Sequence, residues 1–386
     1  MEHVFFCTGH ELKIPNIVRS EGVYLYDEKA KRYMDLQSGV WCTSIGHNNS
    51  EINHAIKRQM DILMHAGFCY SNEIIEKSAK SILDIAGFRN GKSVFLCSGS
   101  EAIEISRQIA KHLTGKNVSL ALQDSYLGAY SSLIDKSRNW HLLDWEKCKT
   151  CSDTENCSLS CEVFQNIPED LSDFTFEPGS SSGFVRFPPK AMIKNVVHIV
   201  RGQDGKIIVN EVTTGIGRTG KWFGHQHYDI TPDLIAVGKG IGNGYPVSVA
   251  LISEPAIREL ELTPFHYSQS HQNDPLGASI AYHVIRYIEE NGLLMKAVSN
   301  GDYLLDQLTS LVDGDLLLEV RGRGLMHAID LKNPRIANSF YQCLIDQGYI
   351  VGNRGTSFRV DPPLTIARSE LDQFIAVLSE TKSLFK

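Results

Sequence analysis

The chain has 386 residues, of which 42% are hydrophobic and 22% charged, and its formal net charge is −7. This composition is ordinary for a soluble globular protein that buries a core without disulfides, and the mild acidity argues against a nucleic-acid or membrane-surface partner. No apolar run is as long as a membrane span, which needs about 18 residues, and the first ten residues lack the features of a signal peptide. We therefore expect a cytoplasmic protein.

Strand-like and helix-like segments alternate through the first two thirds of the chain. Residues 21–36 predict a β-hairpin around a polar turn at 27–31, and apolar residues at helical spacing predict a helix over 50–66. Five short apolar runs predict buried strands at residues 93–97, 118–122, 207–209, 234–238 and 247–252. Helical stretches separate several of these runs, which predicts an α/β fold with a mostly parallel sheet between helices.

Beyond these runs the pattern becomes helical, and then predicts a strand pair over 316–331 and a final helix over 369–385. We therefore expect a large α/β domain over residues 49–284 and a smaller α+β domain over 285–386. The N-terminal segment, residues 1–48, is expected to pack with the smaller domain.

Four of the nine cysteines lie close together in the spacing C-x2-C-x5-C-x3-C, at Cys148, Cys151, Cys157 and Cys161. The C-x2-C pair lets one turn present two thiolates to a metal ion, and the polar residues between the cysteines indicate a loop. Free or disulfide-bonded thiols are the more common state of such a loop, and the sequence leaves both interpretations open. The other five cysteines are scattered, which predicts small buried side chains in a reducing compartment.

Lys239 follows the apolar run at 234–238 and opens the glycine-rich turn GIGNGYP. The end of a strand is where a parallel sheet presents functional groups, and the flanking glycines let a flat ligand approach the backbone. A lysine that is partly desolvated at such a place can have a lowered pKa and form a Schiff base. Taken alone, a lysine after a strand is more commonly a solvated side chain.

Two further strand ends carry polar residues. The run at 93–97 is followed by Ser-Gly-Ser at 98–100, where Ser98 and Glu101 fit a capping box at the start of a helix. The free N–H groups of such a junction form a site for an anion, most often phosphate, although an ordinary capped helix is equally compatible. Asn210 ends another strand and is followed by Glu211 and Val212, so we expect these motifs to share one crevice.

Taken together, these motifs make the chain similar to the class III pyridoxal-phosphate-dependent aminotransferases, the group of ornithine, acetylornithine and 4-aminobutyrate aminotransferases. The similarity covers nearly the whole chain, and the stretches GIGRTG and PDLIAVGKG are its most specific parts. The resemblance implies PLP fold type I, in which a large domain with a mostly parallel seven-stranded sheet is joined to a smaller α+β domain. It also implies a homodimer with active sites at the interface, and transfer of an amino group from an amino acid or amine to a 2-oxo acid.

The resemblance also implies roles for individual residues at a pyridoxal 5′-phosphate site. Lys239 would form the internal aldimine and later carry the proton between the substrate Cα and the cofactor. Gly99 and Ser100 would hold the phosphate, Tyr126 would stack on the pyridine ring, and Val212 would pack on its opposite face.

Three other residues match positions that bind the substrate or reach the neighbouring subunit. Arg359 matches an arginine that pairs with a substrate carboxylate, a contact suited to the guanidinium fork. Ser270 falls, within a residue or two, where the family has a threonine that reaches the partner's cofactor phosphate. Trp41 lies where the family lines its substrate pocket with aromatic residues, and is equally compatible with a plain core tryptophan.

The chain departs from the family pattern at Asn210, where the family has an aspartate that keeps the pyridine nitrogen protonated. A neutral amide can donate a hydrogen bond to that nitrogen but cannot stabilise its positive charge, so carbanion formation should be slower. Three interpretations remain open at this point. The protein is a slow aminotransferase, a racemase, epimerase or lyase that needs a weaker electron sink, or a catalytically impaired homologue that still binds the cofactor.

Further departures concern the substrate. Leu127 replaces a histidine that commonly follows the stacking aromatic. Ser182 stands where ornithine and 4-aminobutyrate enzymes have a glutamate that pairs with the carboxylate-binding arginine, whereas Glu177 is retained. Without that glutamate, we expect Arg359 to be always available, which favours substrates with an α-carboxylate. The cysteine loop is expected to border the entrance of the active site.

Overall fold

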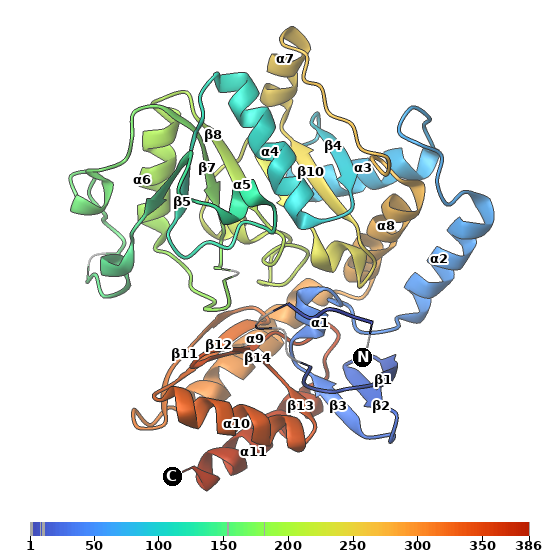
Figure 1. Ribbon diagram of the computed structural model, residues 1–386, viewed down its shortest axis with the longest axis vertical. Helices are drawn as coiled ribbons and strands as arrows, with labels where there is room; N and C mark the ends of the chain where they lie inside the picture. The colour runs from blue at the N-terminus through green and yellow to red at the C-terminus, as the bar shows by residue number, and fades with distance from the viewer. Residues whose placement is uncertain (1–2, 8, 10–11, 153, 181, 386) are drawn as a thin grey trace.

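The computed structural model describes residues 3–7, 9, 12–152, 154–180 and 182–385, and Figure 1 shows it as a larger upper part and a smaller lower part. The upper part is built on a seven-stranded sheet in the order β4-β10-β9-β8-β7-β5-β6. Its strands are β4 (Lys92–Leu96), β5 (Val118–Leu122), β6 (Trp140–Leu143), β7 (Leu171–Phe176), β8 (Lys206–Asn210), β9 (Leu234–Val237) and β10 (Ser248–Ile252). Only β10 runs antiparallel to its neighbours, so the mostly parallel sheet of the predicted fold class is confirmed.

Helices cover both faces of this sheet. Alternate residues of β9 face opposite ways: Leu234 and Ala236 belong to the core beneath α4 (Gly99–Thr114), whereas Ile235 and Val237 belong to the core shared with α8 (Pro275–Glu290). Burial on both faces explains why these strands appear in the sequence as continuous apolar runs. The remaining helices of the upper part are α2 (Ser50–Ile62), α3 (Glu73–Ala86), α5 (Ser131–Ile134), α6 (Lys190–Arg201) and α7 (Glu254–Leu262).

The five predicted strands are all present, but the sequence analysis missed β6 and β7. β7 is completely buried although it contains Ser172 and Asp173. The Asp173 carboxylate accepts hydrogen bonds from the hydroxyl groups of Ser119, Ser172 and Thr175, at 2.6 to 2.7 Å. A buried carboxylate is tolerated when it is satisfied in this way, so the polar residues concealed a central strand.

The smaller part contains a four-stranded antiparallel sheet in the order β11-β12-β15-β14. Its strands are β11 (Leu317–Arg323), β12 (Met326–Leu331), β14 (Gly352–Arg354) and β15 (Ser357–Val360). Helices α9 (Leu293–Ser310) and α10 (Pro334–Asp346) pack against it, and α11 (Arg368–Leu384) packs against these two helices (Figure 1). The predicted strand pair and final helix are therefore confirmed.

The N-terminal segment forms a second small sheet with the C-terminal part of the chain. Strands β1 (Ile17–Glu21), β2 (Tyr24–Asp27) and β3 (Arg32–Asp35) are antiparallel neighbours, and β13 (Tyr349–Ile350) pairs in parallel with β3. The short turn α1 (Ser38–Trp41) follows and leads into the large part. The domain boundaries expected from the sequence stay predictions, and the one after residue 284 falls inside α8.

The scattered cysteines differ from the expectation of buried side chains. Cys7 and Cys69 are exposed, while Cys42, Cys97 and Cys343 are only partly buried, and all five are free thiols. A free thiol on the surface is stable only in a reducing environment or when a partner covers it. Among the described helices, not one combines the length and the apolar character that crossing a membrane requires.

Candidate active site

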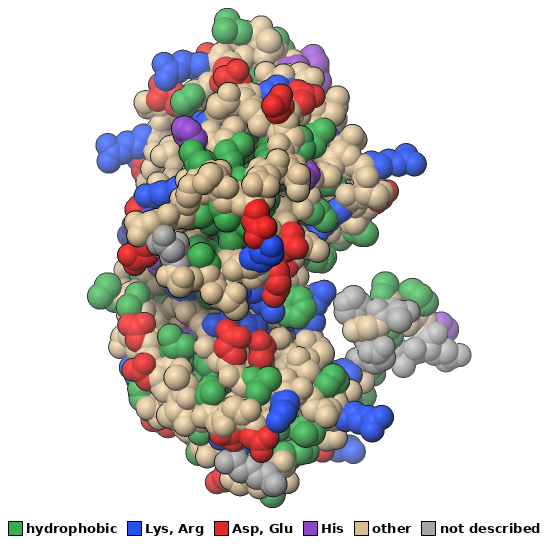
Figure 2. Space-filling model, turned by 90° about the vertical axis from the view of Figure 1, so that its left-hand side faces the viewer, with side chains coloured by type: hydrophobic (Ala, Val, Ile, Leu, Met, Phe, Trp, Pro, Cys, Tyr) green, Lys and Arg blue, Asp and Glu red, His purple; other side chains and the backbone are tan. Residues whose placement is uncertain are grey.

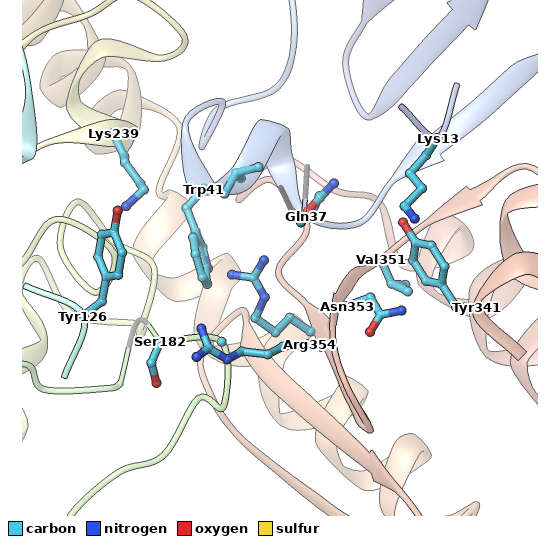
Figure 3. Close-up of a pocket in the computed structure, with 14 residues that line it drawn as sticks. Lys13, Gln37, Trp41, Tyr126, Ser182, Lys239, Tyr341, Val351, Asn353 and Arg354 are labelled. Carbon is cyan, nitrogen blue, oxygen red and sulfur yellow. The ribbon is translucent and has the colours of Figure 1, made fainter. Parts of the chain in front are cut away.

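A cavity of about 740 Å³ lies where the large part, the small part and the N-terminal segment meet. Figure 3 shows side chains from all three pointing into it. It is lined by Gly9, Lys13, Gln37, Val40, Trp41, Tyr126, Ser182, Gly183, Lys239, Tyr341, Val351, Asn353, Arg354 and Arg359. The structure thus brings four residues predicted from the sequence into one cavity: Trp41, Tyr126, Lys239 and Arg359.

Lys239 lies directly after β9, in a left-handed backbone conformation with φ +46°. Its ammonium group lies 5.5 Å from the centre of the Trp41 ring, and Tyr126 points toward it in Figure 3. Burial lowers the pKa of Lys239, and the positive charge of Arg359 acts in the same direction, while Cys42 and Glu177 oppose the shift. A lysine with a lowered pKa supplies the neutral amine that nucleophilic and proton-transfer chemistry needs.

The start of α4 forms a cradle beside Lys239. Ser98 caps the helix, and the Glu101 carboxylate accepts 2.8 Å hydrogen bonds from the N–H groups of Cys97 and Ser98, so the predicted capping box is confirmed. The N–H groups of Gly99 and Ser100 lie in the first helical turn, where helix geometry offers them no acceptor. These groups and the helix dipole favour an anion at this end of the helix.

Only a glycine fits at residue 99, because Val212 occupies the space where a side chain would lie. A Cβ at Gly99 would be only 2.7 Å from Cγ1 of Val212, and a Cβ at Gly238 would be 3.2 Å from the Cα of Gly99. The cradle, Val212 and the strand end that carries Lys239 are therefore in direct contact. The hydroxyl oxygen of Ser100 accepts a 2.9 Å hydrogen bond from the N–H of Ala129.

Asn210 forms a hydrogen bond with Glu177, and neither residue lines the cavity itself. Its side-chain amide donates a 2.9 Å hydrogen bond to Glu177, and its amide oxygen accepts one of 3.1 Å from the N–H of Val212. Glu177 also accepts 3.2 Å hydrogen bonds from the N–H groups of Tyr126 and Leu127. Glu177 therefore fixes both the aromatic that faces Lys239 and the amide that replaces the expected aspartate, a connection that the sequence analysis did not find.

Arg359 stacks on Trp41 with its guanidinium carbon 3.9 Å from the ring centre. Its Nε is buried, and no hydrogen-bond partner for it occurs among the described residues. Burial lowers the pKa of Arg359. Burial also raises the pKa of the neighbouring Asp361 carboxyl to about 6, against the opposing effect of Arg359 and Arg218. Arg359 lines the cavity, and its terminal nitrogens make no hydrogen bond to another described residue, so they keep hydrogen-bonding capacity for a ligand. Trp41 is 4% exposed, so it is both a core residue and part of the cavity wall.

Arg354 is a cavity residue that the sequence analysis missed. Strands β14 and β15 form a hairpin in which Gly352 is opposite Arg359 and Arg354 is opposite Ser357, so both arginines project from the same face. Gly352 leaves room for its neighbour, since a Cβ there would lie 2.5 Å from Nε of Arg359. The spacing R-G-T-x-x-R around a two-residue turn could have indicated this pair of cations.

Ser270 lies elsewhere, on the exposed loop between α7 and α8. The structure does not bring it into the cavity of its own chain. The adjacent Gln269 contacts the Cys97 sulfur at 3.8 Å, so this loop runs beside the strand end that precedes the cradle. Ser182 does line the cavity, and its hydroxyl is buried without a hydrogen-bond partner among the described residues.

A strand-end lysine, an anion cradle at a helix start and a seven-stranded, mostly parallel sheet define a fold type I enzyme. The model of the aminotransferase class-III family matches residues 8–141 and 141–381. The chain therefore belongs to the class III aminotransferases, which use pyridoxal 5′-phosphate.

Similar proteins carry several names. The acetylornithine aminotransferase of Aquifex aeolicus is 29% identical over 94% of this chain and 96% of its own length. A leucine/methionine racemase of Thermococcus litoralis is 27% identical over 92% of this chain and 88% of its own. The structure of taurine:2-oxoglutarate aminotransferase from Bifidobacterium kashiwanohense, in complex with PLP and glutamate, superimposes with a TM-score of 0.90. It is 20% identical and covers 99% of this chain and 96% of that one.

Proposed function

We propose that this aminotransferase acts on α-amino acids and 2-oxo acids, with Lys239 as the catalytic residue. The observation that carries the proposal is the pairing of a buried lysine of lowered pKa with a buried arginine that has unused hydrogen-bonding capacity in the same cavity. When bound, the cofactor supplies the electron sink that stabilises negative charge at the substrate Cα. The amine of Lys239 takes the proton from that carbon and returns it.

The residues around Lys239 fit this cofactor. The N–H groups of Gly99 and Ser100 suit its phosphate, and the close contact of Gly99 with Val212 leaves no space for a larger residue there. Tyr126 and Val212 are the candidates for holding the two faces of the ring, and Asn210 is the candidate for its nitrogen. As a neutral amide held by Glu177, Asn210 offers hydrogen bonding but no negative charge.

The two arginines favour a substrate with an α-carboxylate. Arg359 presents a guanidinium fork over Trp41, and Arg354 projects from the same face of the hairpin. Ser182 lines the same cavity with a neutral side chain, so it does not neutralise Arg359 as a glutamate would. These features support α-amino acids over ω-amino donors.

A racemase activity on the same scaffold is the second candidate. It is favoured by the neutral Asn210, which weakens the electron sink, and by the similarity to a protein named leucine/methionine racemase. Racemisation needs only removal and return of the Cα proton, whereas transamination also needs protonation of the cofactor.

The deciding experiment is a visible absorption spectrum of the purified, cofactor-loaded protein during a screen of amino acids without any oxo acid. Conversion of the lysine-bound band to the pyridoxamine form identifies an amino donor and supports transamination. Loss of optical purity with an unchanged band supports the racemase. Lys239→Ala should abolish the band, whereas the matched control Lys206→Ala should keep it. Negligible turnover with every amino acid would contradict both candidates.

We further propose a homodimer in which Ser270 reaches the site of the second subunit. Ser270 lies on an exposed loop away from its own cavity, as such a role requires. A band of apolar side chains on and after α2 is at least half exposed, which a partner subunit would cover: Met60, Ile62, Met64, Phe68 and Tyr70. Sedimentation at micromolar concentration tests the dimer, and Met64→Lys should weaken it.

A further inference from the structure

The longest connection in the sheet that contains no α-helix among its described residues carries the four clustered cysteines. It runs from the end of β6 at residue 143 to the start of β7 at residue 171, and the only regular elements among its described residues are two short 3₁₀ turns, Glu146–Lys149 and Glu162–Phe164. A loop of this length without helix or strand is uncommon inside a compact domain unless it has a function or an internal crosslink. In Figure 1 it projects from the left-hand edge of the large part.

The loop is nevertheless held to the body of the protein. The Trp145 indole N–H donates a 2.8 Å hydrogen bond to Asp124, and the Asn195 side chain donates one of 2.7 Å to the carbonyl of Cys157. Trp145 and Phe164 are buried in the apolar core that α6 shares with β7. Both ends of the cysteine segment are therefore anchored, which fixes its path.

Three of the four cysteine side chains lie on this anchored core. Cys148 is buried in it, and Cys157 and Cys161 pack against the same cluster, while Cys151 is exposed at the rim. Cys157, Cys161 and Cys151 all lie close enough to Cys148 to interact with it electrostatically. In the described part of the chain, ligand atoms of three residues come within 4.8 Å of one another only at His65, His271 and Asp274. No three of the four sulfurs therefore lie that close together, and a metal ion would have to draw them inward.

The charges around the loop do not favour reactive thiolates. A redox-active cysteine needs a nearby cation that stabilises its thiolate. The two lysines of the segment already have acidic partners, since Lys147 lies 2.6 Å from Glu162 and Lys149 pairs with Glu146. Figure 2, which views this side of the molecule, shows acidic and basic side chains close together near its middle. A metal ion bound by these sulfurs would itself supply the positive charge that deprotonates adjacent thiols.

We propose that Cys148, Cys151, Cys157 and Cys161 bind a thiophilic metal centre, either a single Zn²⁺ or an iron–sulfur cluster. Four thiolates in a C-x2-C-containing segment are the ligand set that both centres use. On binding, the thiols release their protons to solvent and the sulfurs close around the metal. The site is separate from Lys239 and does not depend on the proposed reaction.

The metal centre would fix one wall of the substrate entrance. The loop residues Trp145, Glu146 and Lys149 line a second cavity of about 560 Å³, which shares Ser182 and Arg354 with the cavity of Lys239. An ordered loop would therefore hold the surroundings of Arg354 in place. Loss of the metal should raise KM for the amino acid more than it lowers kcat.

The test is metal analysis of holoenzyme purified without chelators. The expected result is about one Zn²⁺ per chain, or iron with a matching amount of acid-labile sulfide, and this content separates the two forms of the centre. Cys148→Ser and Cys157→Ser should each lose the metal and keep the absorption of the lysine-bound cofactor. Cys343→Ser is the matched control and should keep the metal, because Cys343 lies on α10 far along the chain.

A second measurement uses the wild-type protein, in case the serine variants do not fold. Titration with a mercurial reagent should release the metal in step with the reaction of about four thiols, as a dye for free Zn²⁺ or Fe²⁺ reports. The proposal is overturned if the holoenzyme contains no stoichiometric metal, if mass spectrometry finds these cysteines in disulfides, or if the serine variants keep the metal. The last result would identify an adventitious ion only.

Discussion

The side-chain amide of Asn210 donates a 2.9 Å hydrogen bond to the carboxylate of Glu177, and both side chains are almost completely buried. Asn210, the residue that departs from the family pattern, therefore suits Glu177. Its amide forms a hydrogen bond with the carboxylate and adds no second negative charge to the buried pair. An aspartate at residue 210 would place two carboxylates in one buried site, where both cannot easily be ionised.

Asn210→Asp should consequently lower the stability of the cofactor-free protein. One carboxyl of the pair would have a raised pKa in the folded state, so the loss is small at low pH and grows as the pH rises through that folded-state pKa. We expect a loss of about 1–3 kcal/mol at neutral pH, which corresponds to a shift of one to two pKa units. Urea unfolding of wild type and variant at pH 5 and pH 8 measures this difference.

The double variant Asn210→Asp, Glu177→Gln is the matched control. It restores one amide and one carboxylate with their positions exchanged, and should recover most of the lost stability. If the single variant is as stable as wild type at both pH values, the two side chains are not coupled as their geometry indicates. Cofactor loading should stabilise the single variant more than wild type, since a protonated pyridine nitrogen supplies the missing positive charge.

Gly99→Ala should weaken cofactor binding through a steric effect. The new methyl group would lie 2.7 Å from Val212, so either the helix start or Val212 must move, at a cost of about 1–3 kcal/mol. We expect a roughly tenfold or larger rise in the dissociation constant for pyridoxal 5′-phosphate, measured by fluorescence titration. Adding Val212→Ala should relieve the contact, and a double variant no better than Gly99→Ala would show that the contact is not the cause.

Arg359→Lys should raise KM for the amino acid while changing kcat much less. Lysine keeps the positive charge but loses the bidentate fork and the stacking on Trp41. Loss of a charge-assisted hydrogen bond of about 1.5–3 kcal/mol corresponds to a roughly 10- to 100-fold rise in KM. Arg335→Lys, at an exposed position on α10, is the control and should leave both constants unchanged. For a substrate without a carboxylate, wild type and Arg359→Lys should have the same KM.

His327 should make the protein sensitive to acid. Burial lowers its pKa from 6.5 to about 4, with Arg218 acting in the same direction. A group with a lowered folded-state pKa contributes stability above its unfolded pKa, and that stability is lost as the pH falls from about 6.5 to about 4.

The comparison of wild type with His327→Gln isolates this effect. The stability advantage of wild type should shrink by up to about 1.4 kcal/mol for each pH unit over that range. Urea unfolding at half-unit pH steps measures it. His266→Gln, at an exposed histidine, should follow wild type. Parallel pH profiles of wild type and His327→Gln would contradict a buried, neutral imidazole.

The sequence indicated the sheet because most of its strands are buried on both faces and therefore appear as apolar runs. β7 was missed because Asp173 is satisfied by three hydroxyl groups, two of which come from its own strand. Only Ser119 lies on a neighbouring strand, and such pairing across a sheet is not visible in local sequence.

The residues around Lys239 were predicted from motifs, but the far wall of the cavity was not. Arg354 and Asn353 enter it through a hairpin near the C-terminus, and Gln37 enters through the N-terminal segment. Their positions depend on how distant parts of the chain pack. Trp41 shows the same limit, since its sequence context left a core role and a pocket role equally open, and the folded chain gives it both.

The parallel pairing of β13 with β3 joins Tyr349 to Met34. During synthesis, the segment that carries Trp41 therefore leaves the ribosome long before the strand that completes its sheet. At about 5–20 residues per second, this interval is on the order of tens of seconds. The large part can fold in that time, but the substrate cavity cannot close until translation is nearly finished. A nascent chain that stops before residue 349 would thus expose an unpaired strand edge, which gives molecular chaperones a defined feature to recognise.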